Sequence, residues 1–447
     1  MMKYFLFSKN VKWGILIVML IIFSKESLAI PSFARQTNLS CNSCHTMFPE
    51  LNAFGRLFKL NGYTLIGIET IQTRDTNDNV DLNLVKIPPV SLMLQTSNTN
   101  NSKGKPGTKN NDVSLPQQLS LFFGGEITPH IGSFIQVTYD DQGAAFGMDN
   151  IDLRYANQIE LGSESLIYGV TLNNNPTIQD IWNSTPAWSF PYASSSVAAS
   201  PITSTLIEGG LAQSVAGLGL YGLFDNLIYG EFSVYKSAQQ GGAHPPDNSS
   251  SGIISSLAPY WRLALQKQFA DQYVELGTFG MSTEMYPSGI TGLTDKYTDI
   301  GFDLNYEKPF GGDWLTAHAS YIHENRNLDA TFNSSGSLNQ SLALNSFKIV
   351  GNYYLHMLVG FSLGYFSITG DGDASFYVPA EYSGSVTGLP DSGGFIFEFN
   401  YLPWMNTKFS LQYVAYNKFN GSSSNYDGTG RDASNNNSLY ILAWLVF

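Results

Sequence analysis

From about residue 84 onwards the chain repeats one pattern, in which roughly ten residues of alternating apolar and polar side chains are followed by a polar break. Residues 299–307, 228–234 and 395–401 show this alternation clearly. In the first of these ranges one face carries Ile300, Phe302, Leu304 and Tyr306, and the other carries Asp299, Asp303, Asn305 and Glu307. Because successive side chains of a strand point to opposite faces, each stretch predicts a strand with one apolar and one polar face. A membrane barrel with lipid outside and a polar lumen requires this arrangement.

The composition favours a membrane barrel over a soluble β-sandwich, whose strands would alternate too. Charged residues make up 13% of the chain, against about 25% in ordinary soluble domains. Aromatic residues reach 14%, and no later apolar segment is long enough to predict a transmembrane helix. The net charge of −13 disfavours nucleic acid as a partner and favours the attraction of cations.

The breaks between the predicted strands alternate between short turns and long polar loops. The predicted short turns are 128–130, 162–163, 225–226, 270–271, 309–313, 355–356 and 403–404. The predicted long loops are 97–116, 140–149, 173–211, 237–257, 283–295, 325–337, 369–392 and 417–437. Seven turns and eight loops make fifteen connections, and therefore about sixteen strands. We expect an all-β fold, an antiparallel outer-membrane barrel whose short turns and two ends face the periplasm.

The C-terminus agrees with this prediction. Its last residues form an alternating apolar row that ends in a terminal phenylalanine: Leu439, Ile441, Ala443, Leu445 and Phe447. Such a row resembles the terminal strand signal of outer-membrane barrels. The alternative is a buried strand that merely happens to finish the chain.

The N-terminus has the features of a secretory signal peptide. Lys3, Lys9 and Lys12 precede a short apolar run at 14–23, and Ser27-Leu28-Ala29 places small residues at the two cleavage-determining positions. The run is too short to span a bilayer comfortably, which makes an uncleaved anchor the less favoured alternative. We therefore expect residues 1–29 to be removed on export.

The chain has only two cysteines, and both lie in Cys41-Asn42-Ser43-Cys44-His45. In c-type haem attachment two such thiols add to the haem vinyl groups, and the adjacent imidazole becomes the proximal iron ligand. A thioredoxin-like redox pair, a zinc half-site and chance are the alternatives. No βαβ unit surrounds the motif, and the next histidine is His130, far from the spacing of a zinc finger. We therefore predict one covalent haem c at Cys41 and Cys44, with His45 on the iron.

The residues after this motif predict a short amphipathic helix. Apolar side chains recur at spacings of three and four between Phe48 and Leu60, and Asn61-Gly62 would end the helix. About fifty residues form too small a core for an independent cytochrome. We therefore divide the chain into a signal peptide (1–29), a haem-binding segment (30–80) and a transmembrane barrel (81–447), with the barrel sheltering the haem.

The sixth iron ligand is not evident from the sequence. Met93 is the first candidate, because it follows the haem segment and shares a polar strand face with Ser91 and Gln95. His318 is the second candidate, and Met47 lies too close to His45 to reach the opposite haem face. Each candidate is more often simply a lining residue.

Two further features of the lumen are open to more than one interpretation. Arg35, Arg56 and Lys59 would pair with haem propionates or with carboxylates of the lumen. The long loop at 173–211, with its prolines, Trp182 and Trp188, would fold inward as a constriction or cap the outer mouth. Its aromatic side chains more often serve packing than electron transfer.

Two segments resemble the fused monohaem cytochrome–porins of the outer membrane of iron-oxidising bacteria. The first runs from Pro31-Ser32-Phe33 through the haem motif to Phe48-Pro49-Glu50-Leu51 and on to Gly62-Tyr63. The second is the stretch 173–188, from Asn173-Asn174-Asn175-Pro176 to Trp188. Asn38 stands where that family is expected to have glycine, and asparagine tolerates the left-handed backbone that such a turn needs.

The resemblance implies oxidation of extracellular Fe(II) at a lumen haem, with electrons passed to a periplasmic cytochrome or copper protein. Two alternatives remain: a diffusion porin with a haem docking module, and an electron conduit for another donor or acceptor. We find no nucleophile–base set and no catalytic residues of a conventional enzyme in the sequence. Outer-membrane lipid is the further expected partner.

Overall fold

The computed structural model describes residues 32–78, 80–140, 145–238 and 245–447. The predicted signal peptide lies outside these residues. The described chain opens with three short helices, α2 (Ser32–Thr37), α3 (Cys41–Cys44) and α4 (Ala53–Leu60). A hairpin of β1 (Thr70–Arg74) and β2 (Val80–Val85) follows, and a large sheet occupies the rest of the chain.

The described residues form a closed antiparallel barrel of sixteen long strands, as predicted. They are β3 (Val90–Asn101), β4 (Asp112–Thr128), β5 (Ile131–Asp140), β6 (Ala145–Leu161), β7 (Glu164–Asn173), β8 (Val215–Phe224), β9 (Ile228–Ser237), β11 (Ala258–Phe269), β12 (Gln272–Tyr286), β13 (Asp295–Phe310), β14 (Asp313–Asn327), β15 (Ser341–Leu355), β16 (Val359–Gly370), β17 (Ser392–Trp404), β18 (Thr407–Lys418) and β19 (Ser438–Val446). Each strand pairs with its neighbours in the chain, and β19 pairs with β3 to close the barrel. A two-residue strand, β10 (Ile253–Ile254), adds to β12.

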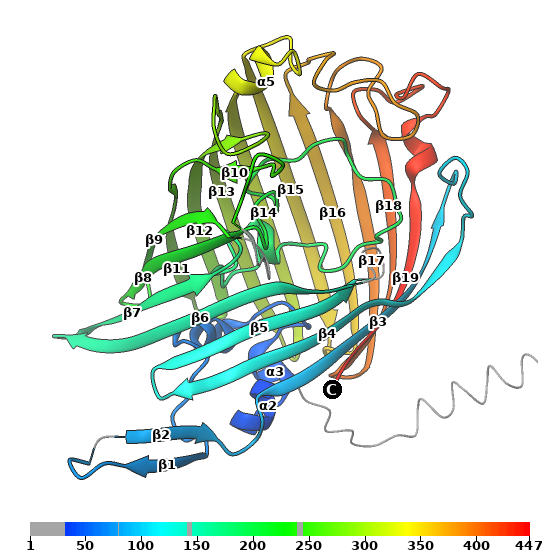
Figure 1. The fold of residues 1–447 in the computed structure, drawn as a ribbon. Coiled ribbons are helices and arrows are strands. Elements are labelled where there is room, and N and C mark those ends of the chain that lie inside the picture. The colour runs from blue at the N-terminus through cyan, green and yellow to red at the C-terminus, as the bar shows by residue number, and fades with distance from the viewer. Residues whose placement is uncertain (1–31, 79, 141–144, 239–244) are drawn as a thin grey trace, which may run out of the picture.

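Short turns and long loops alternate around the barrel, with one exception to the predicted places. Of the predicted long loop 140–149, residues 145–149 belong to β6, and residues 141–144 lie outside the described residues. The short connections gather at one end, together with the C-terminus and the helices α2 and α3 (Figure 1). The long loops gather at the opposite end, where α5 (Asp329–Asn333) and the 3-10 turn η2 (Ala433–Asn436) lie. Both ends of the barrel therefore lie on the short-turn side, as an even number of strands requires.

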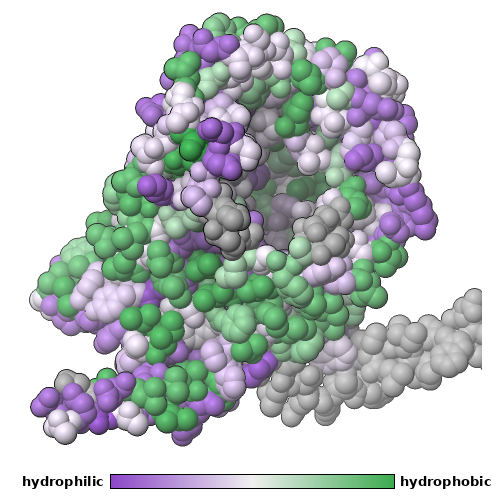
Figure 2. Space-filling view, viewed as in Figure 1, coloured by the Kyte–Doolittle hydropathy of each residue, from purple (hydrophilic) through white to green (hydrophobic). Residues whose placement is uncertain are grey.

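The strands have the two faces that their sequence predicts. Phe302 is 56% exposed on the outside of β13, whereas Asp303 beside it is 5% exposed and faces the lumen. The same contrast separates Phe397 from Glu398 on β17. In Figure 2 hydrophobic residues gather over the outer face of the strands, and the long-loop end is hollowed. Burying such an apolar surface against lipid is what holds a barrel in a membrane.

The hairpin of β1 and β2 was not predicted. Its strands pair with each other and not with the barrel, whose first strand begins at Val90. The boundary placed at residue 80 falls inside this hairpin. Ile71, Leu82 and Leu84 alternate with polar neighbours as the barrel strands do, so periodicity alone does not separate the two structures. Among the described residues, no helix has the length and apolar character needed to cross a membrane.

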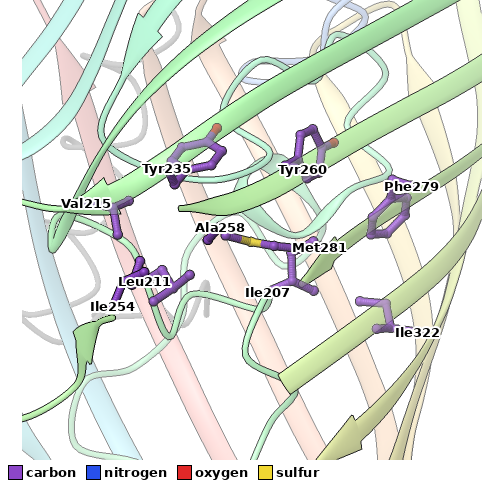
Figure 3. Packing of buried hydrophobic residues seen from close by; sticks show 10 residues of the cluster. All are labelled: Ile207, Leu211, Val215, Tyr235, Ile254, Ala258, Tyr260, Phe279, Met281 and Ile322. Atoms are coloured by element: carbon purple, nitrogen blue, oxygen red, sulfur yellow. The ribbon is translucent and has the colours of Figure 1, made fainter. Parts of the chain in front are cut away.

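The connection between β7 and β8, residues 174–214, runs through the lumen (Figure 1). It contains one 3-10 turn, η1 (Pro186–Trp188). Its last part inserts Ile207 and Leu211 into an apolar cluster on the inner wall (Figure 3). The inward interpretation of this loop is therefore confirmed, and we call residues 174–214 the inward loop.

Candidate functional site

Residues 32–63, which we call the plug, are fixed to the inside of the barrel at its short-turn end. Arg56 of α4 forms a buried ion pair with Glu307 of β13. Tyr63 donates a hydrogen bond of 2.6 Å to Asp152 of β6. On other strands, the carbonyl of Val90 accepts a bond from Arg35, and the Phe48 ring packs edge-on against Trp444. The plug is thus held by strands from around the circumference.

Within the plug, the Cys41–His45 motif is packed directly against α4. Asn52 caps that helix by accepting a hydrogen bond of 3.1 Å from the Gly55 amide. A Cβ atom at Gly55 would lie 2.2 Å from the carbonyl oxygen of Cys44, so only glycine permits this approach. Before the motif, Asn38 has a φ of 55°, the left-handed conformation expected for it.

The two thiols and the imidazole of the motif open onto one cavity. Cys41 and Cys44 begin and end the single helical turn α3, and residues three apart lie on the same side of a helix. Together with His45 they line an internal cavity of about 460 Å³. The aromatic residues of its wall are Phe33, Phe48, Phe54, Phe58, Tyr63, Phe122, Phe134, Trp188, Tyr192 and Trp444. We call this space the plug cavity.

The ring of His45 is oriented by two backbone carbonyls. Its Nδ1 lies 3.1 Å from the oxygen of Pro49 and 3.2 Å from the oxygen of Glu50, and so donates its proton to them. Nε2 has no hydrogen-bond partner among the described residues. Burial lowers the pKa of His45, although the two carbonyls and the Glu50 charge oppose this shift. A neutral imidazole with Nδ1–H anchored and Nε2 free is the form that binds a metal.

The pKa of each thiol lies above its ordinary value. Burial raises the pKa of Cys41. Burial, followed by the charge of Cys41, raises the pKa of Cys44 to about 11. A redox-active CxxC pair needs a lowered thiol pKa. The structure therefore disfavours the thioredoxin-like alternative.

Met93, the first candidate for a sixth ligand, lines the same cavity as His45. It points inward from β3 and is 3% exposed. Its sulfur accepts only a weak bond of 3.8 Å from Gln95. His318 does not line this cavity, and its Nε2 lies 3.2 Å from the Glu50 carboxylate. Met47 packs against Tyr354 instead.

These residues fit a c-type haem. Two thiols one helical turn apart, an imidazole with a free Nε2 and a thioether share one aromatic-walled cavity. His–Met ligation inside an apolar pocket is a known arrangement for cytochromes c. Within the described ranges, no group of three or more histidine, cysteine or carboxylate side chains has the arrangement of a preformed metal site.

Glu50 is a central residue that the sequence reasoning missed. Its buried carboxylate accepts hydrogen bonds of 2.9 Å from Thr46 and 2.8 Å from Tyr354. Burial raises its pKa, but the His318 charge and these bonds outweigh burial and lower the pKa overall. Because its own carbonyl orients His45, Glu50 links the Cys41–His45 motif to the wall. Its partners on the barrel wall, Thr316, Asn352 and Tyr354, are more than 250 residues away in sequence, and no local pattern indicates them.

The basic residues of the plug pair with the protein itself. Arg56 contacts Glu307, and its guanidinium lies 4.1 Å from the centre of the Tyr273 ring. Lys59 donates bonds of 2.7 Å to the carbonyls of Ile178 and Asp180 in the inward loop. For Arg56, pairing with a lumen carboxylate is therefore the correct interpretation.

The acidic residues of the lumen are also largely paired. Arg262 lies 2.8 Å from Asp303 and 3.1 Å from Glu275. Glu231 accepts bonds from Tyr229 and Ser233. These carboxylates are parts of a packed polar core, and their pairing weakens any attraction for cations.

No model of a known protein family matches the chain, and no curated protein matches it. Several solved outer-membrane proteins resemble it in structure. OmpT of Vibrio cholerae is 10% identical, with a TM-score of 0.42, over 80% of this chain and 96% of that chain. The channel DcaP of Acinetobacter baumannii is 12% identical, with a TM-score of 0.44, over 80% and 96%. OmpF of Salmonella typhi is 12% identical, with a TM-score of 0.43, over 80% and 97%. Similarities this distant carry no conclusion about function, and the barrel stands on its own strand pairing.

Proposed function

We propose that this protein is a monohaem cytochrome of the outer membrane that carries electrons between the cell exterior and the periplasm. The observation behind this proposal is the plug cavity, where Cys41, Cys44 and His45 meet inside a lipid-facing barrel. Because outer-membrane barrels place their short turns in the periplasm, the cavity opens near the periplasmic end. A periplasmic cytochrome or copper protein would be the partner there.

Each residue of the site has a defined task in this proposal. Cys41 and Cys44 would hold the cofactor covalently, and His45 and Met93 would bind the iron. Haem c would supply one-electron chemistry within an aromatic, water-poor wall. The carbonyls of Pro49 and Glu50 fix the imidazole of His45. Little movement of this side chain would therefore accompany a change in the charge of the iron.

Extracellular Fe(II) is the electron donor that we propose. The family resemblance of residues 31–63 and 173–188 supports it, and transfer without direct coordination needs no dedicated iron site. Keeping oxidation outside the cell would also prevent ferric oxide from precipitating in the periplasm. Another donor, or electron flow towards an external acceptor, would use the same plug cavity.

A diffusion porin in which haem serves only as a docking module is the second candidate. It is favoured by a second hollow of about 510 Å³ in the lumen, between the inward loop and strands β14–β19. Against it stands the plug, which fills the short-turn end and is fixed there by buried polar contacts.

The visible spectrum of the purified, oxidised protein tests this proposal. Anaerobic Fe(II) should produce sharp reduced c-type bands, and the double variant Cys41→Ser/Cys44→Ser should show no covalent haem. Reduction by dithionite but not by Fe(II) would exclude iron as the donor. Absence of covalent haem from the wild-type protein matured in a cytochrome c-competent host would refute the cytochrome itself. Large, steady conductance in planar bilayers would then favour the porin.

A further inference from the structure

The hollow of about 510 Å³ has a wall that is unusual for the lumen of a membrane barrel. Inward positions of such strands are normally polar. Here, neighbouring strands β15–β18 present an apolar inner patch: Val350, Phe366, Ile368, Ile396 and Val414. Phe190 of the inward loop packs on this patch, and Gly364 makes room for its ring. We call this hollow the upper chamber.

The opposite side of the upper chamber is lined with hydroxyl groups of the inward loop. Ser194, Ser200 and Ser204 are exposed to it, and their hydroxyls have no hydrogen-bond partner in the part of the chain that the structure describes. These groups are free to bond a ligand that also contacts the apolar patch. The chamber thus offers an apolar wall facing a row of small donors and acceptors.

The upper chamber carries little net charge, although the chain as a whole is acidic. Lys348 and Glu208, which both line it, pair at 2.7 Å. His318, the other basic side chain of the lining, is paired with Glu50. A hydrated cation would therefore find no free carboxylate among these lining residues. The chemistry matches an uncharged, amphipathic organic molecule instead.

We propose that the upper chamber binds a small, neutral aromatic molecule that carries hydroxyl or carbonyl groups. Its ring would lie on the patch around Phe366 and Val414, and its polar groups would face the serines of the inward loop. The chamber volume falls within the range of about 300–1,000 Å³ that is typical of small-molecule sites. This inference goes beyond electron transfer and does not depend on it. The chamber and the plug cavity share Asn183, Ser189 and Pro191, so a bound molecule would lie beside the candidate haem site.

Titration calorimetry of the full-length, detergent-solubilised protein with the phenol umbelliferone tests this site, with heats from matched detergent subtracted. The wild type should show saturable binding at a single site. Ser200→Trp, which fills the chamber from an exposed loop position, should weaken binding by about tenfold or more. Ser196→Trp makes the same change at an exposed position of the same loop outside the lining and should bind like the wild type.

A second substitution tests the apolar wall separately. Val414→Ser removes apolar area without filling the chamber and should also weaken binding. Absence of saturable wild-type binding, an unaffected Ser200→Trp variant, or equal losses in both tryptophan variants would each overturn the proposal. If the wild-type protein carries covalent haem that Fe(II) reduces but does not bind umbelliferone, the upper chamber is not a ligand site. The proposal of a cytochrome would be unaffected by that result.

Discussion

The ion pair between Arg56 and Glu307 should decide how firmly the plug is held. Both side chains are about 3% exposed, and the second contact of the pair, between Nη2 and Oε2, measures 3.2 Å. Removing one partner of a buried pair leaves an uncompensated charge, which costs about 3–5 kcal/mol. Arg56→Met and Glu307→Leu should each lower the opening free energy of α4 by about this amount, equivalent to roughly two to four orders of magnitude in the opening constant.

The double variant distinguishes pairing from other contacts. Arg56 also donates a bond of 3.1 Å to the Leu51 carbonyl and stacks on Tyr273. Arg56→Met therefore loses these contacts as well. In Arg56→Met/Glu307→Leu no buried charge is left alone, so the total loss should be much smaller than the sum of the single losses.

Hydrogen exchange followed by mass spectrometry measures these effects directly. Peptides covering Ala53–Leu60 report local opening of the plug, and peptides from the barrel strands report opening of the barrel. We expect faster exchange in the plug peptides alone. Single variants that change the opening free energy by less than about 1 kcal/mol, or losses that are additive, would refute the role given to this pair.

Three further predictions concern the plug and the inward loop. Burial lowers the pKa of Lys59 from 10.5 to about 7. Between these two pH values the unfolded chain binds a proton at Lys59 that the folded chain does not bind, so the melting temperature should rise as the pH rises from about 7 to about 10. Lys59→Met should remove this dependence on pH. Gly55→Ala forces a Cβ against the Cys44 carbonyl and should destabilise the plug by at least about 1–3 kcal/mol, with a lower haem-to-protein absorbance ratio. Gly351→Ala, whose Cβ would meet nothing within 4 Å, is its matched control and should change neither quantity. Deleting residues 186–204 should raise single-channel conductance in planar bilayers, and unchanged conductance would show that the inward loop does not limit passage.

Regular alternation made the barrel predictable from sequence. A strand exposes its two faces to two different solvents, so Phe302 and Asp303 reveal their environments without any tertiary information. The same rule could not assign β1 and β2, because an isolated hairpin also alternates. Turn positions followed from the polar breaks, and the closure of β19 on β3 followed from the even number of strands.

The candidate site was predictable only where its residues lie close together in the sequence. The motif from Cys41 to His45 is contiguous, and Met93 could be named as a candidate ligand because it follows closely on an inward face. The contacts of Glu50 with Tyr354 and of Arg56 with Glu307 could not be found in this way, since each joins residues more than 250 positions apart. Such contacts depend on the position of the plug inside the barrel, and that position produces no periodicity or characteristic spacing in the sequence.

The contacts of the plug also bear on the order in which the molecule is assembled. Arg35 binds the first strand of the barrel, and Phe48 packs on the last, so the plug bridges the seam where β3 and β19 meet. A plug that entered a preformed barrel would have to form its contacts on both sides of this seam at once. We therefore expect the N-terminal segment to serve as a template on which the barrel closes, with any cofactor attached before the final strand pairs.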